Sequence, residues 1–214
     1  MCTYICRFVI LMRKISYTVP PALDGSSVAA VLRSHGFSTA LLRSLKKTYG
    51  ALSRNGCPVR TVDPVHTGDI VAVELNTDGA TAPPSAEKAV IVYADRDILV
   101  VNKRAGMAMY ETYNHHGNAL SNAVAAAGFD GPFRPIYRLD KDTSGLVVLA
   151  RHQLSAAKLA GRVQKDYYAV VPGTYTGSGT VDAPIAHCPD STVKRCVDPV
   201  SYTHLRAHET RRHL

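Results

Sequence analysis

The stretch Arg134-Pro-Ile-Tyr-Arg-Leu-Asp-Lys-Asp-Thr-Ser-Gly-Leu-Val-Val-Leu-Ala150 decides how the rest of the sequence is interpreted. An extended apolar segment leads into a polar loop over residues 140–145, and the β-rich run Leu146 to Ala150 follows. An acid at the end of a strand is held rigidly and still reaches a ligand, and catalytic groups are often placed on such loops. Asp, Thr, Ser and Gly are also ordinary turn residues. On composition alone a plain hairpin turn is the commoner explanation, and a catalytic loop is the alternative.

The order of the residues in this loop favours catalysis. Tyr137-Arg-Leu-Asp-Lys-Asp-Thr-Ser-Gly-Leu146 resembles the signature of the RluA-type RNA pseudouridine synthases, in which Arg-Leu-Asp is followed two residues later by Thr-Ser-Gly. The resemblance implies that Asp140 is the catalytic residue. The family commonly has His before the Arg, whereas this chain has Tyr137, so the local contacts of the loop are expected to differ.

A second segment, Lys165-Asp-Tyr-Tyr-Ala-Val-Val-Pro-Gly173, is predicted to form a strand. It resembles the family motif Lys-x-Tyr-x-Ala-x-Val, which implies that Tyr167 is the functional tyrosine. We expect Tyr167 to stack on the target base and to assist proton transfer. Tyr168 alternates to the opposite face of a strand and is expected to be structural. Without the resemblance, Tyr167 would be an ordinary half-buried strand residue.

Pseudouridine formation breaks the N-glycosidic bond of uridine, turns the base and rejoins it through carbon. A carboxylate suits this reaction as a nucleophile or as the stabiliser of an oxocarbenium-like centre, and Asp140 fills that place by resemblance. The carboxylate must stay ionised beside RNA phosphates, which calls for a neighbouring cation. The resemblance implies that the Arg of the family's third motif supplies this cation, with Arg138 as a secondary candidate. The sequence contains neither a P-loop nor a dinucleotide fingerprint, so we expect no cofactor.

Basic residues follow an N-terminal pattern of two short helices over residues 24–48. Gly36 is predicted to stop the first helix, and Ser38 to cap the second. The Asn55-Gly56 pair predicts a hairpin, and residues 68–75 predict a β-branched strand. Together they resemble the alpha-L RNA-binding module, which implies phosphate contacts by the basic residues of the second helix, Arg43, Lys46 and Lys47. A solvated basic helix face is the alternative.

The domain prediction depends on residues 76–87, which show no periodicity and are expected to form a linker. We therefore predict an alpha-L-like module over residues 12–75 and the N-terminal part of a catalytic domain over residues 88–199. The predicted fold class is α+β, with an incomplete mixed or antiparallel sheet and flanking helices.

Within the catalytic part, residues 89–103 predict a hairpin, and residues 118–127 and 153–163 predict helices. The hairpin continues into Lys103-Arg-Ala-Gly-Met107, which resembles the Lys-Pro-Ala-Gly turn of the family with Arg104 in place of Pro. We assign Lys103 to RNA binding, with a mere strand end as the alternative.

Composition limits the partners of the chain. A net charge of +8 over 214 residues suits RNA, and 46% hydrophobic residues suffice for a packed core. No apolar run has transmembrane length. The five scattered cysteines lack zinc-finger spacing, and the His115-His116 pair has no suitably spaced third ligand. We therefore expect a cytoplasmic monomer with free thiols, without a metal and without a membrane partner.

The last residues break the family pattern. Val200-Ser-Tyr-Thr-His-Leu-Arg-Ala-His-Glu-Thr210 matches a one-frame translation of a transposase-type library adapter. We therefore expect residues 200–214 to be an artefact and the chain to be a truncated record of a longer enzyme. The family's third motif, Arg-x-His-Gln-Ile-Arg, would lie beyond this break. Residues 1–11 are likewise expected to be upstream sequence, with Met12 as the start.

The functional prediction is an RNA pseudouridine synthase that isomerises uridine in structured RNA, with ribosomal RNA favoured over transfer RNA and the recorded fragment itself inactive. One alternative is a non-catalytic or degenerate RNA-binding protein that uses the N-terminal module alone. Another is an unrelated Asp-dependent hydrolase, for which a paired carboxylate or a metal requirement would speak. Asp142 is close to Asp140, but a turn residue at that position is usually a cap.

Overall fold

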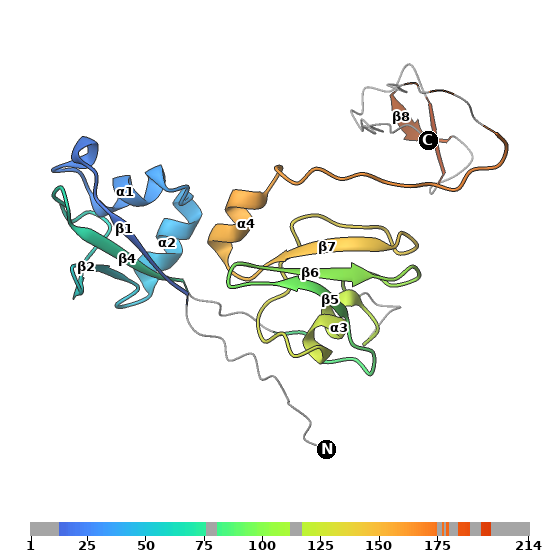
Figure 1. The fold of residues 1–214 in the computed structure, drawn as a ribbon, viewed down its shortest axis with the longest axis horizontal. Helices are drawn as coiled ribbons and strands as arrows, with labels where there is room; N and C mark the ends of the chain where they lie inside the picture. Colours follow the sequence, from blue (N-terminus) through green and yellow to red (C-terminus); the bar gives the residue numbers. More distant parts are fainter. Residues whose placement is uncertain are drawn as a thin grey trace. The chain divides into compact units, whose positions relative to one another are not determined.

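In the computed structural model (Figure 1), the residues described are 13–75, 81–111, 117–174, 177, 179, 184–188 and 194–197. The chain divides into two compact units, Met1–Val163 and Gln164–Leu214. Helices and antiparallel strands make up the described part, which confirms the α+β prediction. The predicted boundaries between module, linker and catalytic part stay a prediction.

An antiparallel sheet with strand order β1-β4-β2-β3 forms near the N-terminus. Its strands are β1 (Arg13–Thr18), β2 (Leu52–Arg54), β3 (Cys57–Pro58) and β4 (Ile70–Leu75). The turn between β2 and β3 has positive φ at both Asn55 (51°) and Gly56 (85°). A two-residue hairpin turn of this kind requires that conformation, so the predicted hairpin is confirmed.

Two helices cover this sheet, α1 (Val28–Ser34) and α2 (Thr39–Lys47), after the 3-10 turn η1 (Pro21–Leu23). The Ser38 side chain accepts a hydrogen bond from the Leu41 amide, as predicted for an N-cap. Gly36 ends the first helix with φ +89°. The helices bury their apolar faces with β4 in one core, whose members include Val28, Val31, Leu32, Leu41, Leu42, Leu45, Val71 and Val73.

A second antiparallel sheet has the order β5-β6-β7, with β5 (Val90–Ala94), β6 (Ile98–Lys103) and β7 (Gly145–Ala150). The predicted hairpin over residues 89–103 is confirmed. The Asp95 carboxylate closes its turn by accepting hydrogen bonds from the amides of Asp97 and Ile98. A second core lies on this sheet, and its members include Leu99, Val101, Met107, Leu120, Val124, Val147 and Leu149.

Two further helices, α3 (Leu120–Ala126) and α4 (Gln153–Leu159), confirm the predicted helices, although α4 ends earlier than predicted. The described part of the expected linker is hydrogen-bonded to α3. The Ser85 amide donates to the Asn122 carbonyl, and the Asn122 side-chain amide donates to the Pro83 carbonyl. Residues 81–87 therefore pack on the fold, whereas residues 76–80 lie outside the described part.

The second unit contains the hairpin of β8 (Ile185–His187) and β9 (Arg195–Val197). The predicted strand over residues 165–173 is wrong, because residues 164–171 have no regular secondary structure. A strand needs a hydrogen-bonded neighbour, and no strand of the described part pairs with this segment. Tyr167 and Tyr168 are 56% and 88% exposed, so the expected alternation of buried and exposed side chains is absent.

Candidate functional site: the Asp140 loop

The Asp140 loop, residues 138–144, is held at the start of β7. The chain before it runs beside β7, since the Ile136 amide donates to the Val148 carbonyl at 2.9 Å. The Tyr137 hydroxyl donates to the Leu146 carbonyl at 2.9 Å and closes the base of the loop. The Thr143 amide donates to the Asp140 carbonyl at 3.2 Å and forms the turn. The predicted order of extended segment, polar loop and strand is therefore confirmed.

Side chains alternate at the start of this loop. Leu139 is buried in the core of the second sheet, whereas Arg138 and Asp140 on either side are exposed. Among the described residues, none forms a hydrogen bond or an ion pair with the Asp140 carboxylate. The core thus fixes the backbone of the loop through Leu139 and leaves the acid accessible, as a group that must reach a ligand requires.

Lys103 anchors the loop from beneath. Its side chain is 0% exposed, and its ammonium donates to the carbonyls of Arg104 (3.2 Å), Met107 (2.8 Å) and Lys141 (2.9 Å). An ammonium has three donors, so its hydrogen-bonding capacity is filled. Burial lowers the pKa of Lys103, while the negative charges of Asp142 and Asp140 oppose that change and the nearby Arg104 adds to it.

The assignment of Lys103 to RNA binding is contradicted by this burial. A fully buried ammonium whose donors are all engaged cannot bind a phosphate without breaking the loop. The alternative interpretation, that Lys103 only ends a strand, agrees better with the structure, because Lys103 is the last residue of β6. The Lys103 ammonium donates to the carbonyl of Lys141, the residue that follows Asp140, and so helps to position the loop. Sequence reasoning missed this positioning role.

An ion pair that sequence reasoning also missed lies beside this anchor. The Arg104 guanidinium contacts the Glu87 carboxylate through Nε and Nη2, both at 2.8 Å at their closest. The pair ties the described end of the expected linker to the turn after β6. A hydrogen bond and the charge of Arg104 lower the pKa of Glu87. The only signal in the sequence was Arg104 itself, which stands where the family has Pro.

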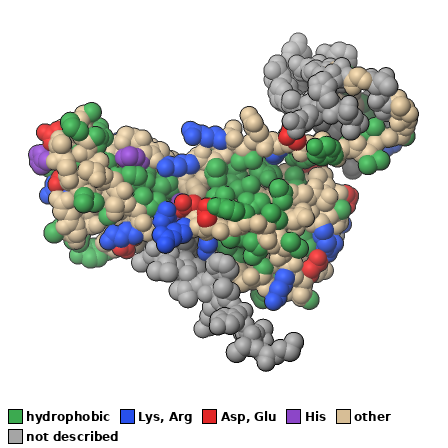
Figure 2. Space-filling view, in the orientation of Figure 1, with side chains coloured by type: hydrophobic (Ala, Val, Ile, Leu, Met, Phe, Trp, Pro, Cys, Tyr) green, Lys and Arg blue, Asp and Glu red, His purple; other side chains and the backbone are tan. Residues whose placement is uncertain are grey.

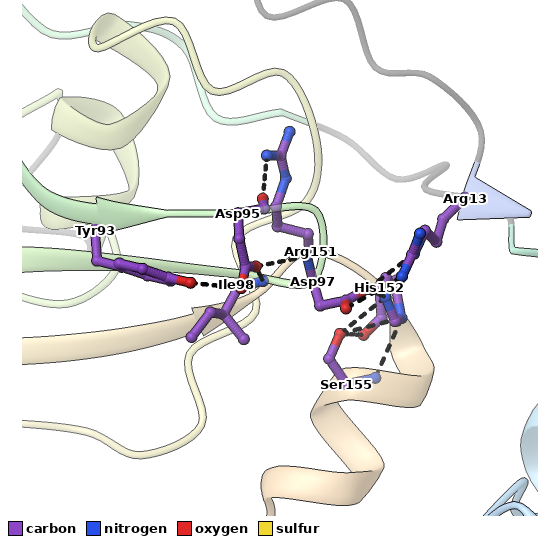
Figure 3. Close-up of polar contacts among 8 residues, drawn as sticks. All are labelled: Arg13, Tyr93, Asp95, Asp97, Ile98, Arg151, His152 and Ser155. Atoms are coloured by element: carbon purple, nitrogen blue, oxygen red, sulfur yellow. Dashed lines mark hydrogen bonds and ion pairs between the residues drawn. The ribbon is translucent and has the colours of Figure 1, made fainter. Parts of the chain in front are cut away.

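A second polar cluster joins the β5–β6 turn to α4 and β1 (Figure 3). The His152 Nε2 lies 2.8 Å from the Asp97 carboxylate, and Arg13 binds the same carboxylate at 3.0 and 3.3 Å. Burial lowers the pKa of His152, while its hydrogen bond to Asp97 works in the opposite direction. Partial burial raises the pKa of Asp97, but hydrogen bonds from His152 and Arg13 outweigh it and leave that pKa below its ordinary value.

The Asp97, His152 and Ser155 side chains have the composition of a hydrolase triad but not its arrangement. The His152 Nδ1 accepts from the Ser155 amide at 3.1 Å, so this nitrogen caps α4 and cannot act as a base. Ser155 is buried, and its hydroxyl lies within hydrogen-bond distance of the His152 carbonyl. The cluster is therefore structural and does not support the hydrolase alternative.

The basic face of α2 carries the three predicted RNA contacts. Arg43, Lys46 and Lys47 are all exposed, while the leucines of the same helix are buried. Lys46 and Lys47 lie in the last turn, where cations also stabilise a helix end. Basic side chains are visible on the surface of this region (Figure 2). RNA contact by these residues stays a prediction.

Several predictions concern other parts of the chain. Tyr167 is exposed in the second unit, and its role stays a prediction. The His115-His116 pair, residues 1–11 and residues 200–214 lie outside the described residues. In the described part, no three His, Cys, Asp or Glu side chains gather as a metal site would need. None of the described helices is long and apolar enough to cross a membrane.

Comparisons with known proteins identify the family of the chain. The model of the family described as RNA pseudouridylate synthase matches residues 97–213. YjbO of Bacillus subtilis, named an uncharacterized RNA pseudouridine synthase, is 32% identical over 176 residues, which are 77% of this chain and 62% of the relative. The ribosomal large subunit pseudouridine synthase D of Pseudomonas aeruginosa is 36% identical over 147 residues, which are 64% of this chain and 46% of the relative.

A third relative extends the match over most of the chain. The ribosomal large subunit pseudouridine synthase D of Xylella fastidiosa is 32% identical over 210 residues, which are 90% of this chain and 62% of the relative. The chain thus spans less than two thirds of the length of these relatives. The family match includes residues 200–213, and their expected adapter origin stays a prediction. By its family match and by these relatives, the chain belongs to the RNA pseudouridylate synthase family, with the expected resemblance to its RluA-type members.

Proposed function

We propose that the complete protein carrying this chain isomerises uridine to pseudouridine in structured RNA, with Asp140 as the catalytic carboxylate. The observation that carries the proposal is the presentation of Asp140. Its carboxylate is exposed on a loop whose backbone is held by buried Leu139 and by the Lys103 ammonium. Two of the relatives are named for the large ribosomal subunit, which supports ribosomal RNA as the substrate.

The chemistry assigned to the site follows from these positions. The target uridine must leave its stack to reach an active site. The Asp140 carboxylate then acts as the nucleophile or stabilises the positive centre that forms as the glycosidic bond breaks. Arg138 is exposed two residues before Asp140, and we assign it the role of a cation near the carboxylate. Tyr167 is proposed to stack on the base and to assist proton transfer.

Binding of the RNA is assigned to the basic face of α2. Arg43, Lys46 and Lys47 are exposed and would neutralise phosphates, which confers affinity and little sequence preference. No cofactor is needed for this isomerisation. The described Cys57 and Cys188 form no disulfide, which supports a reducing compartment such as the cytoplasm.

The test is an Asp140→Asn variant of the complete protein, assayed for pseudouridine in a ribosomal RNA transcript. Loss of a catalytic nucleophile lowers turnover by at least about a thousandfold, while the isosteric change leaves RNA binding intact. Asp142→Asn is the matched control, because it removes an exposed carboxylate from the same loop. Unchanged product formation by Asp140→Asn would exclude Asp140. RNA binding without product by the unaltered protein would favour a non-catalytic RNA-binding role.

A further inference from the structure

A groove in the first sheet's module lies apart from the Asp140 loop. It has a volume of about 620 Å³ and lies between the end of α2 and the segment that follows β3. Pockets of roughly 300–1,000 Å³ hold small ligands in proteins, so the groove has the size of a small-molecule site. Buried Leu45 and Leu52 contribute to its lining. The charged and aromatic residues of the lining are Lys46, Tyr49, Arg60 and Asp63.

Tyr49 is the unusual member of this lining. Its side chain is 96% exposed, although a tyrosine carries a large apolar ring. It stands just before Gly50, whose φ of +78° turns the chain from α2 toward β2. Val62, 65% exposed, also lines the groove and adds apolar surface. In contrast, the ring of Tyr17 in β1 is stacked on His35 at 3.9 Å.

Positive charge accompanies the exposed ring. Lys46 lines the groove from the last turn of α2, and Arg60 lines it from the segment after β3. The Arg60 side chain is 83% exposed and is steadied by Asp63, which contacts its Nε at 3.2 Å. The Asp63 carboxylate also accepts from the Arg60 amide at 2.7 Å. The two cations exceed this single acid, and Lys47 adds further charge beside them on α2.

We propose that this groove binds one unpaired nucleotide of the RNA substrate. The base stacks on Tyr49, and Lys46 and Arg60 hold the flanking phosphates. Stacking on an exposed aromatic beside basic side chains is how proteins bind single-stranded nucleic acid with little sequence preference. The proposal rests on the proposed function for the presence of RNA. It adds a preference for a single-stranded segment, which a basic helix face alone does not give.

The test measures binding rather than turnover. Fluorescence anisotropy of the full chain compares a hairpin RNA carrying an unpaired loop with a fully paired duplex of the same length. Tyr49→Leu keeps apolar bulk but removes the stacking ring, so it weakens loop binding about five- to a hundredfold. Tyr49→Phe retains affinity, because the ring is kept. Tyr168→Leu is the matched control, since Tyr168 is similarly exposed outside the groove.

Salt dependence separates stacking from charge. Lys46→Gln reduces the slope of log affinity against log salt by about one, as the loss of one phosphate contact does, whereas Tyr49→Leu leaves that slope unchanged. Equal loop binding by Tyr49→Leu and the unaltered chain would overturn the proposal, as would equal losses in Tyr49→Leu and Tyr168→Leu. Displacement of the RNA by an acidic peptide at comparable affinity would also overturn it in favour of a protein partner. A failure here leaves the Asp140→Asn result untouched, so the two proposals can fail separately.

Discussion

Lys103 positions the candidate site although its own side chain is buried beneath the loop. The carbonyls of Arg104, Met107 and Lys141 converge on its ammonium. Among the residues that the structure describes, Lys103 is the only buried Lys, Arg, Asp or Glu. These carbonyls belong to the turn after β6 and to the Asp140 loop. The buried charge is compensated because every donor has an acceptor, and the two loops are thereby held together.

Removing this ammonium should be costly. Lys103→Met keeps the aliphatic length but leaves buried carbonyl oxygens without a donor, so the free energy of unfolding falls by about 3 kcal/mol. Urea denaturation of the chain measures the change. Lys88→Met is the control, because Lys88 is exposed and such a change stays within about 0.5 kcal/mol. If Lys103→Met is as stable as Lys88→Met, the ammonium does not anchor the loops.

The sequence predicted the position of the loop residues better than their roles. The order of residues around Asp140 places the acid in a turn before a strand, because local polarity and β-branched runs carry that information. Whether Lys103 faces solvent or lies beneath the loop depends on Met107 and Lys141, which only the folded chain brings to its side. A lysine at a strand end has the same local pattern in both cases.

At the scale of elements, α4 links parts of the first unit. Its residue Leu154 is buried with the core of the first sheet, while its N-cap His152 binds Asp97 of the β5–β6 turn. Arg13 of β1 reaches the same carboxylate. The sequence predicted the helix from its apolar spacing but gave no sign of these contacts, because the partners are more than 50 residues apart.

This N-cap predicts a pH dependence of stability. Burial lowers the pKa of His152. The charges of Arg13 and Arg134 lower it further, while Asp97 raises it but does not outweigh them. The unfolded chain therefore takes up a proton at a higher pH than the folded chain. Stability therefore falls as the pH drops below the ordinary histidine value of about 6.5. The pKa of His35 is lowered by burial and by Lys158, and that residue contributes with the same sign.

The variant His152→Asn isolates this contribution. Asn still caps a helix, but it does not titrate. The loss of stability between about pH 7.5 and pH 5.5 is therefore expected to be smaller in this variant than in the unaltered chain. The loss that remains is the part due to His35. Urea midpoints at the two pH values measure it. His66→Asn, at an exposed histidine, is the control. An unchanged pH dependence in His152→Asn would show that His152 is not protonated differently in the two states.

At the scale of the whole molecule, an exposed apolar strand bears on the prediction that the protein is a monomer. All five residues of β5 are exposed, and in the described part β5 pairs only with β6. Hydrophobic side chains gather on the visible face over this sheet (Figure 2). The sequence predicted the hairpin correctly, but its β-branched run could not tell a covered strand from an exposed one, because both have the same local pattern.

An exposed apolar edge strand is a site for pairing between chains. We therefore predict that the chain self-associates with increasing concentration and that Val92→Lys, at a 56% exposed position of β5, shifts it toward the monomer. A charge on an edge opposes pairing with a second chain and removes apolar surface from the contact. Sedimentation velocity over a concentration series measures the effect, with Val62→Lys as a control at an exposed valine outside this sheet. A monomer at every concentration would show that β5 attracts no second chain, and equal effects of the two lysines would assign the change to net charge.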